Sequence, residues 1–233
     1  MRGRMRHLKR WLVAGVGVAV LLLVGPFVYI HFIEGKAPAP LALSSPSAPA
    51  ASSDPIQAAT GTDGTWNVST GSLVGYRVKE VLFGQSNVAV GRTGHITGSI
   101  TVRGSTVTAG SFTVDMATVT SDESRRDDQF NGRIMETAAF PTATFKLAQP
   151  IDLGSLPALG TEVTEQAQGE LILHGVTRTV SFSVIGRFTG SEVQVAGSIP
   201  ITFANWDIPN PSFGPITTED HGVLEFALNF TAA

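Results

Sequence analysis

Cysteine is absent from the 233 residues of this chain. Its absence excludes disulfide bonds, zinc–thiolate sites, iron–sulfur clusters and cysteine nucleophiles together. Hydrophobic residues make up 42% of the chain, enough for a sizeable core. Because a domain with such a core does not need disulfides, the lack of cysteine is compatible with an exported protein.

Basic side chains are scarce beyond the N-terminal quarter. Residues 61–233 carry ten Lys and Arg against seventeen Asp and Glu, a net charge of −7, whereas residues 1–60 carry six against two, a net charge of +4. Nucleic-acid binding depends mainly on contacts from Lys and Arg to phosphates, and an acidic domain repels them. We therefore expect no nucleic-acid partner.

Charge is also nearly absent from residues 11–33, which follow a basic leader at residues 1–10. About 20 apolar residues in a helix span the hydrocarbon core of a bilayer, so this run predicts a transmembrane helix. The leader predicts an N-terminus that stays in the cytoplasm. The run exceeds a signal-peptide core and lacks a small-residue cleavage site directly after it, which favours an uncleaved signal anchor over a cleaved signal peptide.

Residues 34–63 are dominated by Ala, Pro and Ser and show no apolar periodicity. Such a composition cannot bury enough surface to offset chain entropy, which predicts an extended, semi-stiff linker. The linker would hold the domain at residues 64–233 off the membrane. The predicted location is the cytoplasmic membrane, with a single span and an extracytoplasmic C-terminal domain.

Residues 64–233 alternate between apolar and polar side chains, the pattern typical of strands. In residues 179–188, for example, one face carries Val180, Phe182, Val184 and Phe188. We expect an all-β fold: an antiparallel β-barrel of about eight strands, with one short helical segment at residues 121–137. A sandwich of two sheets remains the alternative, because alternation does not distinguish the two.

Recognisable catalytic and metal-binding motifs are missing from the domain. Its Ser residues lie in no G-x-S-x-G or S-x-x-K pattern, and its three His residues, His95, His174 and His221, stand singly. In residues 122–128, acidic side chains alternate with Arg125 and Arg126. The simpler interpretation is a short helix stabilised by Arg–Asp pairs, and the functional one is a lid whose Arg residues contact an anionic head group. We expect no catalytic residue and no metal.

The apolar strand faces form either a filled core or a cavity, since a barrel of eight strands is just wide enough for side chains or one small ligand. Several inward positions carry small residues that would leave room, namely Gly98, Ala143, Gly186 and Gly197. Periodicity does not decide between the two interpretations.

Four stretches in order resemble a known family. They are residues 71–79 (GSLVGYRVK), residues 114–145 with Arg126-Asp127 and FPTATF, residues 169–180 (GELILHGVTRTV), and residues 225–230 (EFALNF). Together they resemble the YceI family of lipocalin-like, polyisoprenoid-binding bacterial proteins over about residues 64–232. The family often has two histidines in its opening strand, and those places here correspond to Gly71 and Glu80.

The resemblance implies a lipocalin-like barrel with an amphiphilic isoprenoid, a polyprenyl lipid or a quinone, in its interior, and no other cofactor. The residues that would line the site are Tyr76, Phe112, Met116, Phe145, Phe182, Phe203 and Phe226, with Arg126 and Trp206 at the mouth. The expected function is a membrane-anchored lipid-binding protein of the cell envelope. The alternatives are an envelope enzyme with an unrecognised site and a structural or partner-binding module with a filled core.

Overall fold

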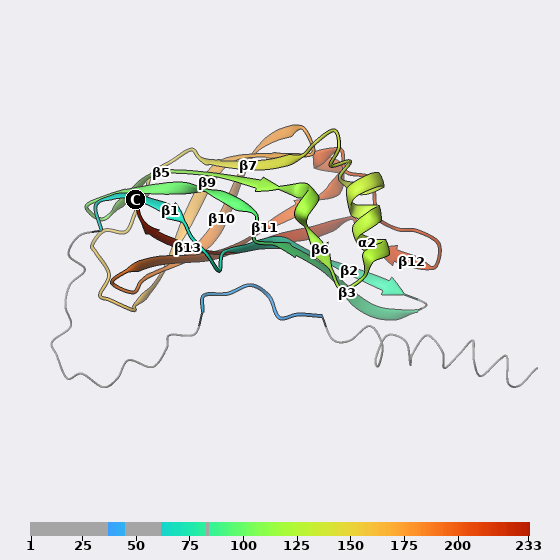
Figure 1. The fold of residues 1–233 in the computed structure, drawn as a ribbon, viewed down its shortest axis with the longest axis horizontal. Helices are drawn as coiled ribbons and strands as arrows, with labels where there is room; N and C mark the ends of the chain where they lie inside the picture. Colours follow the sequence, from blue (N-terminus) through green and yellow to red (C-terminus); the bar gives the residue numbers. More distant parts are fainter. Residues whose placement is uncertain (1–36, 45–61, 83) are drawn as a thin grey trace, which may run out of the picture.

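One antiparallel sheet forms the body of the molecule (Figure 1). The computed structural model describes residues 37–44, 62–82 and 84–233. Its strands are β1 (Gly64–Val68), β2 (Leu73–Leu82), β3 (Gln85–Thr93), β4 (Ile96–Arg103), β5 (Thr106–Asp115), β6 (Thr120–Ser121), β7 (Thr142–Leu147), β8 (Ile151–Asp152), β9 (Glu162–Leu173), β10 (Val176–Phe188), β11 (Glu192–Thr202), β12 (Ile216–Thr218) and β13 (His221–Ala232).

The predicted leader and transmembrane span lie outside the described residues. Within the described ranges, no helix has the length and apolar character needed to cross a bilayer.

The sheet closes into a barrel. Among the described residues, the order β1-β4-β5-β7-β9-β10-β11-β13 returns to β1, because β13 also pairs with β1. Val68 lies opposite Phe230 and Trp66 opposite Ala232, while on its other side Trp66 lies opposite Ile100 of β4. This ring confirms the predicted antiparallel barrel of about eight strands and excludes the two-sheet sandwich.

Strand β13 is shared by two neighbours on the same side. Its last residues pair with β1, and residues 223–227 pair with β2. The β2–β3 hairpin carries the wall onward, β3 pairs with the short β6, and β12 pairs with β2. The barrel wall is therefore built differently at its two ends, with β1 at one end and β2, β3 and β6 at the other.

The helical segment is shorter than the predicted residues 121–137. Helix α2 (Ser124–Gln129) continues into a π-helical turn, η3 (Phe130–Ile134), where the Met135 N–H donates to the Phe130 carbonyl at 2.8 Å. This wider turn directs Phe130 into the barrel, where it is 7% exposed. Figure 1 shows α2 beside β6, β2 and β12, so it stands at the end opposite β1.

Apolar side chains form two buried clusters, one toward each end of the interior. Around β1, the cluster contains Trp66, Ile96, Ile100, Val102, Phe188, Leu228 and Phe230. A larger cluster, which includes Val78, Met116, Phe130 and Phe203, lies toward α2. Trp66 anchors the first cluster, because its indole N–H donates to the Thr62 carbonyl at 2.8 Å and its ring meets Phe188 edge-on at 5.6 Å.

Residues 37–44 form neither helix nor strand and lie on the outside of the barrel. The carbonyl of Pro38 accepts from Arg77 of β2, and the amide of Leu41 donates to Glu225 of β13. This part of the predicted linker therefore contacts the domain that it precedes.

The Phe230 side chain is fully buried where β13 meets β1. Replacing Phe230 by Ala should lower the free energy of unfolding by about 3–5 kcal/mol, the usual cost of emptying a buried Phe site. Phe213→Ala is the matched control, because that ring is 60% exposed. Equilibrium unfolding in urea measures both changes, and equal losses in the two variants would contradict the assignment of Phe230 to the barrel closure.

Candidate functional site

A cavity of about 830 Å³ occupies the barrel interior. Its wall includes eight of the nine residues predicted from the sequence: Tyr76, Phe112, Met116, Arg126, Phe145, Phe182, Phe203 and Phe226. They come from five strands and three helical elements, so the barrel brings together residues that are far apart in the sequence. The volume lies within the range of about 300–1,000 Å³ typical of small-molecule sites.

The ninth predicted residue, Trp206, lies elsewhere. It ends the 3₁₀ turn η4 (Phe203–Trp206), is only 3% exposed, and is not part of the cavity wall. Its carbonyl lies 3.2 Å from Nδ1 of His174, in the β9–β10 turn. Because a carbonyl only accepts, His174 donates this hydrogen bond, and Trp206 serves to pack η4 against the barrel.

Three inward aromatic rings lie against glycines on a neighbouring strand. The pairs are Tyr76 on Gly91, Phe145 on Gly169 and Phe226 on Gly197, and a Cβ on each glycine would come within 2.4, 2.3 and 2.6 Å of the ring. No larger residue fits at these glycines unless the ring moves. The aromatic side chains are thus held flat along the wall, which keeps them out of the centre of the cavity.

The small inward residues do not all leave free room, contrary to the expectation from the sequence. Gly197 is covered by the Phe226 ring, and a Cβ on Gly98 would lie 2.1 Å from the Ser111 carbonyl. Those two glycines permit close approach of backbone and rings. Gly186 is different, because the nearest atoms to its Cβ position are 3.9 Å away. Gly186 therefore does open space in the cavity.

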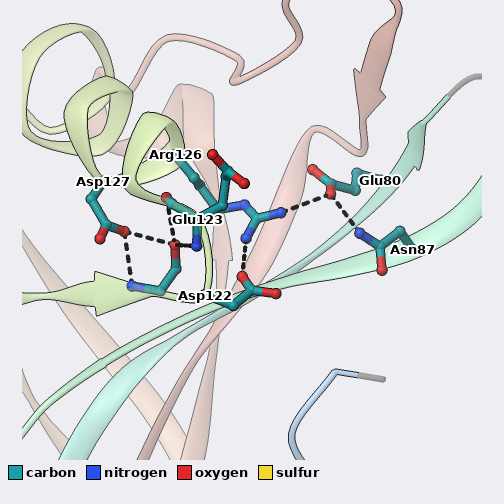
Figure 2. A network of polar contacts seen from close by, with 7 residues as sticks. Glu80, Asn87, Asp122, Glu123, Arg126 and Asp127 are labelled. Carbon is teal, nitrogen blue, oxygen red and sulfur yellow. Dashed lines mark hydrogen bonds and ion pairs between the residues drawn. The ribbon is translucent and has the colours of Figure 1, made fainter. Parts of the chain in front are cut away.

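Charged groups gather at the α2 end of the cavity (Figure 2). Glu80 follows Tyr76 and Val78 on the inward face of β2 and is 8% exposed. Its Oε1 accepts from Asn87 at 2.9 Å and from Nη2 of Arg126 at 3.4 Å. Arg126 also pairs with Asp122, one helical turn earlier. The cavity is therefore apolar along the barrel and carries an ion-pair network at one end.

A second set of bonds fixes the position of Arg126. The carboxylate of Asp127 accepts from both the amide and the hydroxyl of Ser121, at 2.8 and 2.7 Å, and the Glu123 amide donates to the same hydroxyl (Figure 2). Because Ser121 belongs to β6, which pairs with β3, these bonds tie α2 to the barrel wall. The Arg–Asp pairing predicted for this segment is confirmed.

Burial and charge shift two pKa values at this end. Burial raises the pKa of the Tyr76 phenol well above its usual value, and the ring is stacked on Phe130 with centroids 5.2 Å apart. Burial alone would lower the pKa of Arg126, but the carboxylates of Glu80 and Asp122 outweigh it and raise that pKa. Tyr76 thus stays neutral and Arg126 stays charged across the physiological range.

Sequence reasoning missed the role of Glu80. The residue was visible as a departure from the family pattern, but its partners could not be identified because Arg126 is 46 residues away. The available signal was its position: in the alternation of β2, an acidic side chain at an inward position must have a partner. Within the described part of the chain, no group of His, Asp and Glu is arranged to hold a metal ion.

The raised pKa of Tyr76 predicts a loss of stability in alkali. The unfolded phenol titrates near pH 10, whereas the folded one stays protonated, so the unfolded state releases the proton first. Above that pH the free energy of unfolding should fall by up to about 1.4 kcal/mol per pH unit. Urea unfolding between pH 8 and 12 measures the slope, and Tyr76→Phe should remove this contribution. An identical slope in both proteins would contradict the assignment.

Breaking the ion pair between Arg126 and Glu80 should lower the free energy of unfolding. Arg126→Met leaves Glu80 buried with only Asn87 as a partner, and we expect a loss of about 1–3 kcal/mol because an unpaired buried charge is unfavourable. Arg125→Met is the control, since Arg125 is exposed. Adding Glu80→Gln to Arg126→Met should restore part of the loss in thermal unfolding, and an additive further loss would argue against coupling of the two residues.

The comparisons with known proteins agree with this architecture. The YceI-like domain family matches residues 66–230. A structure described as a polyisoprenoid binding domain from Saccharophagus degradans aligns with a TM-score of 0.59 at 18% identity, over 73% of this chain and 99% of that chain. BcnA of Burkholderia cenocepacia aligns with a TM-score of 0.51 at 19% identity, over 66% and 95%.

At these identities, the two structures show a shared fold. No curated protein matches the chain. The match to the family extends from β1 to β13 and so includes every strand of the ring. The chain belongs to the YceI-like domain family.

Proposed function

We propose that this chain is a membrane-anchored, extracytoplasmic lipid-binding protein that holds an isoprenoid-type amphiphile, a polyprenyl lipid or a quinone, inside its barrel. The observation that carries the proposal is the cavity of about 830 Å³, apolar along its length and charged at the α2 end. An amphiphile has the same division, with a long apolar tail and one polar head.

The wall chemistry suits a tail better than a compact polar substrate. Phe112, Phe145, Phe182 and Phe226 form a continuous series of ring contacts, with centroids between 5.6 and 6.4 Å apart. Apolar burial contributes roughly 25 cal/mol per Å², so a tail along these rings gains affinity from its length and not from any single contact. The polar head would then lie near Glu80 and Arg126.

The relatives support the same class of ligand. The Saccharophagus degradans domain is described as polyisoprenoid binding, and it shares the fold with this chain over 73% of the chain's length. We assign the same ligand class to this protein because its cavity is apolar along the barrel and charged at one end, as a ligand with an apolar tail and a polar head requires.

Membrane anchoring is proposed from the N-terminal sequence. The basic leader and the apolar run at residues 11–33 would place the N-terminus in the cytoplasm and the barrel outside the cytoplasmic membrane. A tethered lipid binder stays at high effective concentration near the bilayer that supplies its ligand.

A non-catalytic role is favoured over the two alternatives. A filled core is inconsistent with the cavity volume. An enzyme would need a group poised for proton transfer, but the two shifted groups at the α2 end are held as a neutral phenol and a permanent cation.

The purified full chain should carry an extractable isoprenoid lipid. Gly186→Leu places a side chain in the open part of the cavity and should reduce the molar ratio of lipid to protein at least severalfold, with little change in folding. Ile185→Leu is the matched control, because the neighbouring side chain is 38% exposed and points outward. Mass spectrometry of solvent extracts measures the ratio.

Two results would count against the proposal. One is protein that contains no isoprenoid lipid and takes up none from isoprenoid-containing detergent micelles. The other is an equal lipid content in Gly186→Leu, Ile185→Leu and the parent chain, which would place the lipid outside the cavity.

A further inference from the structure

Several side chains on the outer face of the barrel are buried. Glu225 of β13 lies between the inward residues Leu224 and Phe226, so it points outward, yet it is 4% exposed. Arg187 of β10 also points outward and is 4% exposed, and Ala196 of β11, which lies between these two positions on the sheet, is 3% exposed. The outer face of a barrel normally meets solvent, so these side chains require a cover.

The cover is the segment at residues 37–44, which we call the strap. Arg77 donates to the Pro38 carbonyl at 2.7 Å, Arg92 donates to the Ala39 carbonyl, and Arg187 donates to the Ser44 carbonyl. The Leu41 amide donates to Oε2 of Glu225 at 3.2 Å. All four bonds use the backbone of the strap, as in recognition of an extended peptide.

The barrel side of this contact is held in place by its own bonds. Glu225 accepts from Nε of Arg77 at 3.3 Å and from Nη2 of Arg92 at 2.7 Å. Arg187 donates to Gln194 at 2.6 Å and to Glu162 at 3.2 Å. On the strap side, Pro38 and Pro40 restrict the chain to extended conformations, which reduces the entropy lost on docking.

The contacts give the strap a direction. Ser44 lies over Arg187, next to the Phe188–Trp66 contact at the β1 end. Pro38 lies over Arg77, three residues before Glu80 on β2, toward the α2 end. Figure 1 shows the strap in blue running along the barrel beside β2 and β3. The N-terminal end of the strap therefore lies nearer to α2 than its C-terminal end does.

We propose that the strap holds the α2 end of the barrel toward the membrane. The inference rests on the anchoring in the proposed function, in which the span ends at residue 33. A free linker of residues 34–63 would reach about 100 Å, whereas the three residues between the span and the docked strap allow at most about 14 Å from residue 33 to residue 37. Docking thus replaces a loose tether by a short, oriented one, contrary to the expectation that the linker holds the domain away.

The α2 end has features that suit a lipid surface. Phe213, on the cavity wall, is 60% exposed, and the Arg133 guanidinium lies 5.7 Å from its ring centre. An exposed ring beside a cation suits the boundary between lipid tails and head groups. With this end at the bilayer, the charged end of the cavity and its apolar rim face the source of the ligand.

The first test measures docking in the full chain in detergent. The chain has no cysteine, so Ala42→Cys and Ser86→Cys create the only two sites for spin labels. We expect a narrow distribution of distances between the labels. Leu41→Pro removes the N–H that Glu225 accepts and should broaden the distribution, whereas Ala39→Pro removes an N–H that makes none of the four bonds and should not. A broad distribution in the parent chain, or equal effects of the two prolines, would overturn the proposal.

The second test measures orientation in phosphatidylcholine–phosphatidylglycerol vesicles with nitroxide-labelled lipids. A fluorophore at Thr217→Cys reports the α2 end, and one at Ser191→Cys reports the other end, about 30 Å away by the rise of a strand. We expect stronger quenching at residue 217 and loss of the difference in Leu41→Pro but not in Ala39→Pro. Equal quenching at both ends in vesicle-bound parent protein contradicts the orientation. If the parent protein does not float with the vesicles, the result contradicts the membrane anchor. The distance between the spin labels then still tests whether the strap docks on the barrel.

Discussion

Closure of the sheet by β13 is the constraint on which the rest of the structure depends. This strand bonds β11 on one side and both β1 and β2 on the other, so it joins the two differently built ends of the wall. Closure leaves no free edge along the ring and fixes which side of every strand is inside. The cavity, the ion pair at its end and the strap on its outside each follow from that assignment of faces.

The interior remains hollow because of where its bulk is placed. Inward rings such as Tyr76 and Phe226 lie flat on glycines of adjacent strands, so large side chains cover the wall without meeting in the middle. The same contacts stiffen the barrel, since a ring held against a neighbouring backbone cannot swing inward. The apolar groups are therefore available both to the fold and to a ligand.

The strand pattern was predictable from local sequence, and the contacts between strands were not. Alternation identified residues 179–188, which lie within β10, and eight of the nine predicted site residues line the cavity. Alternation alone did not separate the predicted barrel from a two-sheet sandwich. It also did not reveal the aromatic ring over Gly197 or the partner of Glu80, because both depend on the register between distant strands. Trp206 was misplaced for the same reason, since a 3₁₀ turn has no strand alternation to follow.

The ion-pair network at the α2 end also bears on the choice of head group. Arg126 is held by the carboxylates of Glu80 and Asp122. An anionic head group would have to displace one of them and leave a carboxylate with less compensation, and for Glu80 that carboxylate is buried. A neutral hydroxyl or quinone head displaces neither. For the lipid ligand proposed above, this cost of exchange would favour members of the class with an uncharged head group.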